Sequence, residues 1–282
     1  MKEYFCGWYF KSQGDKTLAV IPAYHKAHGK TSCSVQIITD GGAWNTVFPF
    51  EDFSKRKQGF FVDVGDNHFG EGGMTLKIDK PGINVFGDVK FGAFTPLKYD
   101  IMGPFRFVPF MQCRHSVVSM AHTVDGEIDV NGEKYVFDGA RGYIEGDRGY
   151  SFPKVYLWTQ CSFDGGSLML SVADIPMAPV HFTGIIGFVY VGGKEYRIAT
   201  YLGAKPEKII SGEVIIRQKD IRLTAKLINK HAHPLFAPVS GAMVRVIRES
   251  ASCTAAYKFE IGNETLLDFQ SDNASFEYEY PN

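Results

Sequence analysis

The sequence predicts an almost entirely β protein built from antiparallel strands, and three observations carry that prediction. Apolar and polar residues alternate with a period of two, as at residues 74–79 and 221–227, which is typical of half-buried antiparallel strands. Turn-forming pairs such as Asp125-Gly126 and Asn131-Gly132 are dense. No sustained stretch carries the 3.6-residue apolar period of an amphipathic helix. Many short strands separated by such turns are typical of barrels or sandwiches.

The elements follow in order from these patterns. Asn131-Gly132 predicts a tight hairpin between residues 128–130 and 135–137. Residues 50–57 are the only candidate for a helical turn before Pro81. Between Gly92 and Phe110 three prolines interrupt aromatic residues, so we expect an irregular segment that covers a sheet edge or an opening. Further strands are predicted around residues 34–37, 74–79, 113–118, 167–172, 188–191, 195–199, 221–227, 257–261 and 276–280.

The composition excludes several classes of function. The chain has 282 residues with 30 basic and 31 acidic side chains, which argues against a nucleic-acid binder that relies on bulk positive charge. Five widely spaced cysteines without a CxxC pair predict neither a disulfide framework nor a zinc ribbon, and they fit reduced thiols. Residues 1–20 lack the plan of a signal peptide, and no apolar run reaches the roughly 18 residues of a membrane-spanning helix. We expect a cytoplasmic protein without a transmembrane segment, and a peripheral membrane contact stays open.

The stretch from Gly139 to Cys161 is chemically unlike its flanks. It holds Glu145, Asp147 and Arg148 among several glycines before Phe152-Pro153. Glycines at this density admit backbone conformations that are closed to other residues, so we expect a shaped loop. The residue before a proline favours extended geometry, and the composition from residue 155 to residue 161 is β-forming.

Three motifs follow one another along the chain. The N-terminal one is Gly7-Trp8-Tyr9-Phe10-Lys11, and the mid-chain one is Tyr143-x-Glu145, Gly149, Phe152-Pro153 and Trp158-x-Gln160-Cys161. Leu235-Phe236-Ala237-Pro238 is the third and the weakest. In this order the motifs resemble the tocopherol cyclase family, and the resemblance spans most of the chain. It implies two lipocalin-like (calycin-type) antiparallel β-barrel or sandwich units in tandem with little helix, which we place at residues 1–145 and 146–282.

The resemblance also implies a reaction. Members of the family close a chromanol ring by adding a phenol oxygen to an alkene in the prenyl tail of a hydroquinone. This chemistry needs a proton for the alkene, aromatic faces near the cationic carbon and the exclusion of water. A carboxylic acid whose pKa is raised by burial can deliver the proton. No nucleotide, flavin or metal is required, so we expect no cofactor and an apolar ligand such as a prenyl quinol or another isoprenoid.

The mid-chain motif implies roles for its residues. Glu145 takes the acidic position and is the candidate acid, and Tyr143 would relay or orient a proton. Trp158 would offer an aromatic face, and Gln160 would hydrogen-bond a substrate oxygen. Asp147 is a candidate second acid. The structural alternatives are a core position for Trp158 and a satisfied buried amide for Gln160.

This sequence departs from the family pattern at two pairs. Asp147-Arg148 stand where relatives have Asn-Trp, and Tyr156-Leu157 replace Trp-Phe. Substrate binding is the role assigned to Arg148, Tyr156 and the motif residue Trp8. The structural alternative for Arg148 is an ion pair with Glu145 that holds the loop in place. His115, on a predicted strand, is a candidate base facing the same cavity. No metal site is predicted, because the histidine pairs lack a completing ligand at close spacing.

Three functions fit these residues. The first is a cofactor-independent cyclase acting on a prenylated hydroquinone or a similar isoprenoid. The second is a non-catalytic lipocalin-like carrier of an apolar ligand, and the third is a related isoprenoid hydratase or isomerase. With 14% aromatic residues the chain can line the apolar cavity that each function needs. Catalysis differs from carriage in requiring a protonatable acid directed into that cavity.

Overall fold

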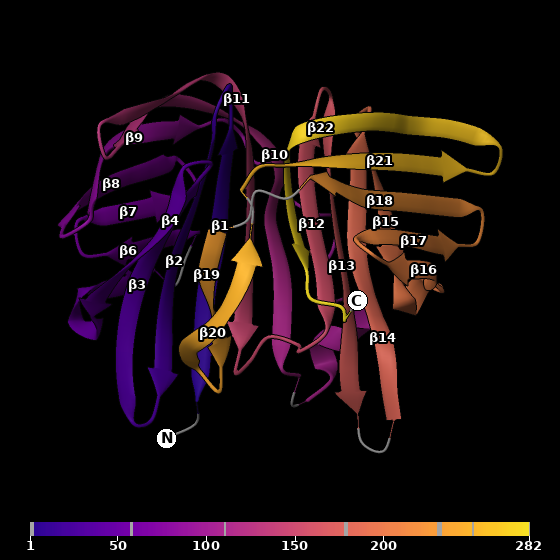
Figure 1. Cartoon of the computed structure of the whole chain (residues 1–282), viewed down its shortest axis with the longest axis horizontal. Coiled ribbons are helices and arrows are strands. Elements are labelled where there is room, and N and C mark those ends of the chain that lie inside the picture. Colours follow the sequence, from indigo (N-terminus) through magenta and orange to yellow (C-terminus); the bar gives the residue numbers. More distant parts are fainter. Residues whose placement is uncertain are drawn as a thin grey trace. The chain divides into compact units, whose positions relative to one another are not determined.

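The computed structural model describes residues 3–56, 59–109, 111–177, 180–229, 233–249 and 251–281. These residues form a nearly all-β protein, as expected (Figure 1). The chain divides into two compact units, each described here by itself. Unit 1 contains Met1–Leu97, Phe110–Phe152 and Leu235–Val246, and unit 2 contains Lys98–Pro109, Pro153–Pro234 and Ile247–Asn282.

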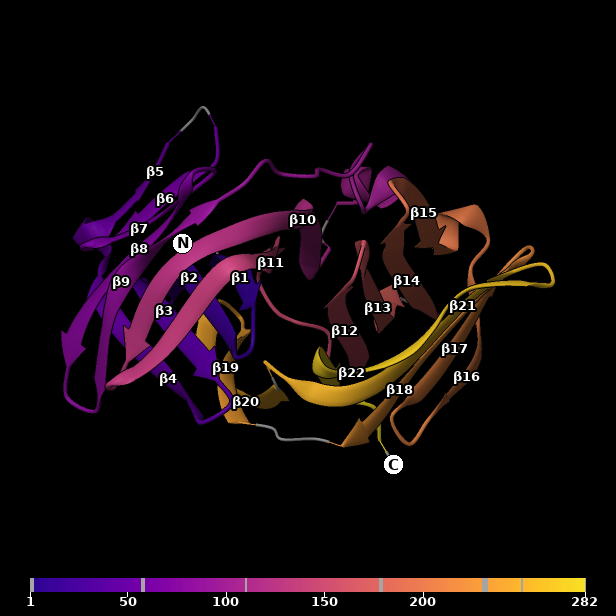
Figure 2. The ribbon, with the colours of Figure 1, turned by 90° about the horizontal axis from the view of Figure 1, so that it is seen from above.

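The described residues of unit 1 form one 11-stranded antiparallel sheet in the order β4-β3-β2-β1-β11-β10-β9-β8-β7-β6-β5. The sheet is strongly curled (Figure 2). A separate two-stranded hairpin, β19–β20, contributes most of its residues to this unit. The strands are β1 (Tyr4–Gln13), β2 (Thr17–Ala27), β3 (Lys30–Thr39), β4 (Gly42–Pro49), β5 (Phe53–Lys55), β6 (Phe61–Val64), β7 (Asn67–Gly70), β8 (Gly73–Lys80), β9 (Ile83–Phe91), β10 (Cys113–Val130), β11 (Glu133–Gly149), β19 (His233–Val239) and β20 (Ala242–Glu249).

The described residues of unit 2 form a nine-stranded sheet in the order β15-β14-β13-β12-β22-β21-β18-β17-β16. Its connectivity repeats that of unit 1. In each unit a meander of four strands, β1–β4 or β12–β15, pairs through its first strand with the last strand of the unit's sheet, β11 or β22. The strands are β12 (Tyr156–Phe163), β13 (Gly166–Met177), β14 (Val180–Val191), β15 (Lys194–Ala199), β16 (Lys205–Ile210), β17 (Glu213–Gln218), β18 (Ile221–Asn229), β21 (Cys253–Ile261) and β22 (Glu264–Tyr278).

Helix is confined to three short 3-10 segments in the described parts of the chain, η1 (Phe50–Asp52), η2 (Gly103–Phe107) and η3 (Thr200–Leu202). Within those same parts, none of the helical segments has the length and apolar character needed to cross a membrane. The helical turn expected over residues 50–57 is therefore limited to η1, and β5 follows it directly. The irregular segment expected from Gly92 to Phe110 is confirmed up to residue 109, while Phe110 lies outside the described residues.

The predicted hairpin at Asn131-Gly132 is confirmed. It joins β10 to β11, and the two residues have φ angles of 55° and 84°. Positive φ at both central positions is what a two-residue turn needs to match the twist of its strands.

Each sheet buries one face in the core of its own unit. Trp8 and Phe10 of β1 and Ile144 of β11 belong to the core of unit 1, and Leu157 and Cys161 of β12 belong to the core of unit 2. Successive side chains of a strand point to opposite faces. The residues between these core positions therefore lie on the other face of each sheet, and that second face carries the candidate site.

The glycine-rich stretch after Gly139 is a strand and not the expected loop, because β11 continues to Gly149. Its glycines make room for neighbouring groups. A Cβ atom at Gly142 would lie 2.2 Å from His122 Nε2, and one at Gly149 would lie 2.0 Å from the carbonyl oxygen of Gln112. The unit boundary expected between residues 145 and 146 falls inside this strand, and unit 1 continues to Phe152.

We expect Gly149→Ala to destabilise the protein by about 1–3 kcal/mol, because the added methyl group meets backbone atoms that cannot rotate away. The free energy of unfolding in urea measures this cost. Gly41→Ala is the matched control, since the nearest atom to its added Cβ would be Thr39 Oγ1 at 3.7 Å. Equal effects of the two substitutions would contradict the steric explanation.

Candidate active site

A cluster of ionisable side chains lies on the face of the unit 1 sheet that points away from the core. Tyr143, Glu145 and Asp147 alternate along β11, so all three share this face. On one side β10 places His115 opposite Asp147, and on the other side β1 places Tyr9 opposite Glu145. The strand pairing thus brings residues of β10 and β11 together with residues of β1, which lies more than a hundred positions earlier in the sequence.

The four side chains form a continuous chain of polar contacts. Tyr143 Oη donates a hydrogen bond of 2.6 Å to Glu145 Oε2. His115 Nε2 lies 3.2 Å from the same carboxylate oxygen, and His115 Nδ1 lies 3.0 Å from Asp147 Oδ1. The contact of His115 with Glu145 is an ion pair without the alignment of an ordinary hydrogen bond. The order of the chain is therefore Tyr143, Glu145, His115 and Asp147.

The charges of these four side chains interact strongly because the side chains are largely buried. The His115 and Glu145 side chains are 8% and 6% exposed, and that of Asp147 is 24% exposed. Burial alone would lower the pKa of His115, but the charges of Glu145 and Asp147 outweigh it and hold that pKa well above its ordinary value. Burial, reinforced by the charge of Glu145, raises the pKa of Tyr143 well above its ordinary value. His115 is thus charged at neutral pH, and Tyr143 keeps its proton.

A further donor meets this cluster from β10. Cys113 Sγ donates a hydrogen bond of 3.2 Å to Asp147 Oδ1. Burial and then the charge of Asp147 raise the pKa of Cys113 well above its ordinary value, so the thiol stays protonated and is a poor nucleophile. The cluster as a whole can store a proton on an imidazolium and pass it to or from a carboxylate, which is what general acid–base catalysis requires.

The same residues also carry donor atoms that a metal ion could bind. His115, Glu145 and Asp147 each offer one ligand atom, and these atoms lie within 4.8 Å of one another. A histidine binds metal through a neutral imidazole nitrogen. Here both ring nitrogens face carboxylate oxygens that favour the charged ring. The arrangement therefore fits an acid–base group better than a metal centre.

Two predicted site residues of unit 1 lie on the opposite face of its sheet. Trp8 is part of the core, where it makes an edge contact with Phe60 and lies beneath the ammonium group of Lys55. Arg148 is exposed and follows Asp147 in the strand, so its side chain points away from Glu145. The alternative ion pair between Glu145 and Arg148 is therefore wrong.

The remaining predicted residues belong to β12 of unit 2. Tyr156, Trp158 and Gln160 are buried on the face of that strand away from the main apolar cluster of unit 2. Trp158 is 6% exposed, so it is a buried strand residue as the structural alternative assumed, but it lies outside that cluster. Tyr156 Oη donates a hydrogen bond to the buried carboxylate of Glu277. Gln160 Nε2 donates to Ser162 Oγ at 3.1 Å, while Gln160 Oε1 has no partner among the described residues. The expected fully satisfied amide is thus only half satisfied.

Sequence reasoning missed two residues beside the cluster. Tyr9 pairs with Glu145 and Lys11 pairs with Tyr143, and both side chains lie on the face of the cluster because they alternate with Trp8 and Phe10. Lys11 is only 2% exposed, and lysine is almost never fully buried unless it is paired. The signal was present in the N-terminal motif, where a lysine continues the alternation of an otherwise aromatic strand.

Histidine NMR should separate the charged ring of His115 from two neutral ones. Burial lowers the pKa of His25 and of His122 to about 4, whereas the pKa of His115 is raised. In protein labelled with ¹³C and ¹⁵N at histidine, we expect at pH 6 an imidazolium spectrum for His115 and neutral spectra for the other two. A neutral His115 at pH 6 would contradict the proton-storing cluster.

The same shifts determine how stability depends on pH. The stabilisation from His115 is fully present below the pKa of an unfolded histidine, near 6.5, and is lost as the pH rises through its higher folded pKa. His25 and His122 act in the opposite sense. As the pH falls from about 6.5 to about 4, the unfolded chain gains protons that the folded protein does not, and stability decreases.

Comparison with known proteins gives a likeness of fold. No protein-family profile matches the chain, and no curated protein matches its sequence. Kievitone hydratase from Nectria haematococca superposes with a TM-score of 0.55 at 10% identity, over 99% of this chain and 89% of that chain. A candidate AttH protein from Nitrosomonas europaea gives 0.53 at 11% identity, over 99% of this chain and 92% of that one. At these identities the likeness concerns the fold alone, and it confirms the lipocalin-like expectation at that level.

Proposed function

We propose that the protein is a cofactor-independent acid–base enzyme that adds an O–H group across a carbon–carbon double bond of an apolar, isoprenoid-type substrate. The observation that carries the proposal is the buried chain of Tyr143, Glu145, His115 and Asp147 on the sheet face away from the core. A buried imidazolium flanked by two carboxylates has no need to be there for packing, since hydrophobic residues of similar volume stabilise an interior at least as well.

The proposed reaction uses this chain in two proton transfers. Bound substrate aligns His115 Nε2 with Glu145 Oε2, 3.2 Å away, and the proton of the ring passes to that carboxylate. Glu145 then gives a proton to the less substituted alkene carbon, where the π electrons form the new C–H bond. Positive charge develops on the more substituted carbon, and a lone pair of the incoming oxygen forms the C–O bond. That oxygen then loses its proton to Asp147, which lies 3.0 Å from His115 Nδ1 and returns the proton to the ring.

Cyclisation and hydration are two versions of this addition. A phenol of the same substrate molecule gives a chromanol-type ring, and water gives an alcohol. The resemblance of the mid-chain motif to tocopherol cyclases supports the first version. The fold shared with a protein named as a hydratase supports the second. Both versions need the same acid, so the cluster is the common requirement.

Incubation of the protein with a prenylated hydroquinone in D₂O tests the proposal. Protonation of the alkene places one deuterium on carbon, where it does not exchange. Cyclisation gives an isomer of the substrate with that deuterium, and hydration gives an alcohol with it, so mass spectrometry and NMR distinguish the two. Recovery of unlabelled substrate across a panel of prenyl chain lengths would contradict the proposal that the protein is such an enzyme.

A non-catalytic carrier is the alternative that this experiment separates. A carrier would bind the same prenylated hydroquinone and release it unchanged and unlabelled. Saturable binding together with unlabelled recovery would therefore assign the protein to carriage, whereas labelled product excludes that assignment.

A further inference from the structure

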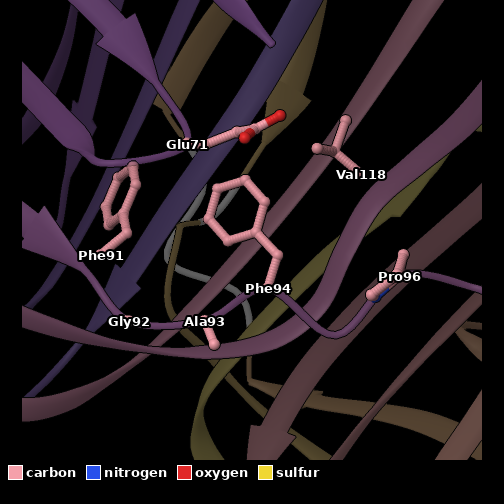
Figure 3. Close-up of a pocket in the computed structure, with 7 residues that line it drawn as sticks. All are labelled: Glu71, Phe91, Gly92, Ala93, Phe94, Pro96 and Val118. Atoms are coloured by element: carbon pink, nitrogen blue, oxygen red, sulfur yellow. The ribbon is translucent and has the colours of Figure 1, made fainter. Parts of the chain in front are cut away.

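A pocket lies in unit 1, on the other side of its sheet from the acid–base cluster. The pocket has a volume of about 520 Å³ and is lined by Glu71, Phe91, Gly92, Ala93, Phe94, Pro96 and Val118 (Figure 3). Phe91, Phe94 and Val118 pack against the core of the unit, whereas Glu145 points to the opposite face. The pocket is thus a separate site, of a size that takes small ligands.

The apolar wall of the pocket is held in place from behind. The rings of Phe91 and Phe94 each lie 4.8 Å from the ring of His122, measured between centroids. In the buried His122 ring, Nδ1 lies 3.0 Å from Ser119 Oγ. Burial lowers the pKa of His122 to about 4, so the ring is uncharged at neutral pH. The wall therefore presents two fixed aromatic rings without a positive charge behind them.

Glu71 is the one charged side chain among the seven that line the pocket. Its Oε1 accepts a hydrogen bond of 3.1 Å from the Phe60 backbone N–H, which holds the carboxylate at the edge of the hollow. Figure 3 shows this carboxylate directed over the pocket, with the Phe94 ring below it. The site thus combines a negative charge at its exposed rim, oriented by this one hydrogen bond, with aromatic faces.

We propose that this pocket binds a small organic cation, a quaternary or protonated amine that carries an apolar or aromatic body. Its charge would pair with Glu71, and its body would lie against Phe91 and Phe94, whose ring faces themselves attract cations. The lining disfavours the other ligand classes. An anion would meet the carboxylate, and a neutral hydrocarbon would remove water from the carboxylate without replacing the lost hydrogen bonds.

Titration with benzyltrimethylammonium, followed by ligand-observed NMR and calorimetry, tests the site. The neutral isostere neopentylbenzene keeps the shape and removes the charge, so we expect it to bind at least about fivefold more weakly. Glu71→Gln keeps an oxygen acceptor for the Phe60 N–H but loses the charge, and it should weaken binding of the cation by about five- to tenfold. The neutral isostere should bind this variant no more weakly than the wild type.

Two further variants make the result specific. Glu51→Gln removes a carboxylate from an exposed position in the same unit outside the pocket, and it should leave binding unchanged. Phe94→Leu should weaken binding of the cation severalfold. The thermal unfolding midpoint of this variant should show that the unit remains folded. Absence of saturable binding up to about 10 mM, or equal binding of the cation to wild type and Glu71→Gln, would overturn the proposal.

The proposal of a cation site and the proposed reaction can be refuted independently of each other. Glu71 and Phe94 are not part of the acid–base cluster, so their variants should still label a prenylated hydroquinone with deuterium at the wild-type rate. Loss of cation binding together with unchanged labelling would confirm that the pocket is a site of its own, whereas loss of both in Glu71→Gln would show that it is not.

Discussion

Glu145→Gln is expected to reduce the turnover of a prenylated hydroquinone by about 10²- to 10⁴-fold, which is the range that a positioned general acid contributes. Glutamine has nearly the same volume and keeps an oxygen that can accept the hydrogen bond from Tyr143 Oη. It cannot take a proton from His115 and release it to an alkene. The rate of deuterium incorporation from D₂O measures this loss directly.

The substitution also removes one of the two negative charges beside His115. The pKa of the histidine should therefore fall, which the histidine NMR spectrum of the variant reports. Glu133→Gln is the matched control, because Glu133 lies on the same strand with a side chain that is 52% exposed. Wild-type turnover in a folded Glu145→Gln protein would remove Glu145 from the mechanism.

Asp147→Asn should be the milder of the two cluster variants. Asp147 is the more exposed of the carboxylates, so solvent can take over part of its role as proton acceptor. We expect a smaller loss of turnover than in Glu145→Gln, together with a downward shift in the pKa of His115. A loss as large as that of Glu145→Gln would mean that solvent does not replace Asp147 as the proton acceptor and that the two carboxylates are equally required.

The local features of the fold could be predicted because they depend on neighbours in sequence. The alternation along residues 74–79 predicts β8, and the dipeptide Asn131-Gly132 predicts the hairpin between β10 and β11. The prediction of a loop in the glycine-rich stretch was wrong for a physical reason. Gly142 and Gly149 are small because other groups approach them, and a sequence read alone cannot distinguish that use of glycine from a turn.

That error also concealed the organisation of the site. Once residues 141–149 are recognised as a strand, the period of two places Tyr143, Glu145 and Asp147 on one face and Arg148 on the other. His115 could be proposed as a base, but its position opposite Asp147 depends on the pairing of β10 with β11. Trp8 was misplaced because its neighbour Tyr9, and not Trp8 itself, shares the face of Glu145.

The assignment of chain segments to the two units could not be predicted from local patterns. The proline-rich segment Lys98–Pro109 belongs to unit 2, although strands of unit 1 precede and follow it in sequence. Leu235–Val246 belongs to unit 1, although it lies deep in the second half of the chain. These assignments depend on contacts between residues far apart in sequence, and a buried ion pair on β15 is the anchor of the first of them.

Arg197 holds the segment Lys98–Pro109 against β15 of unit 2. Its Nη2 donates to the Tyr99 carbonyl oxygen at 2.9 Å and to Glu195 Oε1 at 2.8 Å, and its Nη1 donates to the Asp100 carbonyl oxygen at 3.1 Å. Glu195 Oε2 in turn accepts a bond of 2.9 Å from the Lys98 N–H. The Arg197 and Glu195 side chains are only 5% and 3% exposed, so each charge depends on the other.

Arg197→Met should therefore destabilise unit 2 by about 3–5 kcal/mol, the cost of leaving one member of a buried ion pair without its partner. The freed segment carries trypsin sites at Lys98 and Arg106, both exposed. We expect faster cleavage at these two sites in the variant, detected by mass spectrometry of limited digests, together with a lower unfolding midpoint in urea.

Two comparisons determine whether the buried charge is the cause. Arg217→Met breaks an exposed pair with Glu207 in the same unit, and it should cost at most about 1 kcal/mol. The double variant Glu195→Gln with Arg197→Met removes both charges and should recover part of the lost stability, because no charge is then left buried without a partner. A double variant as unstable as Arg197→Met alone would mean that Arg197 acts through its bonds to the carbonyl oxygens of Tyr99 and Asp100 and not through its charge.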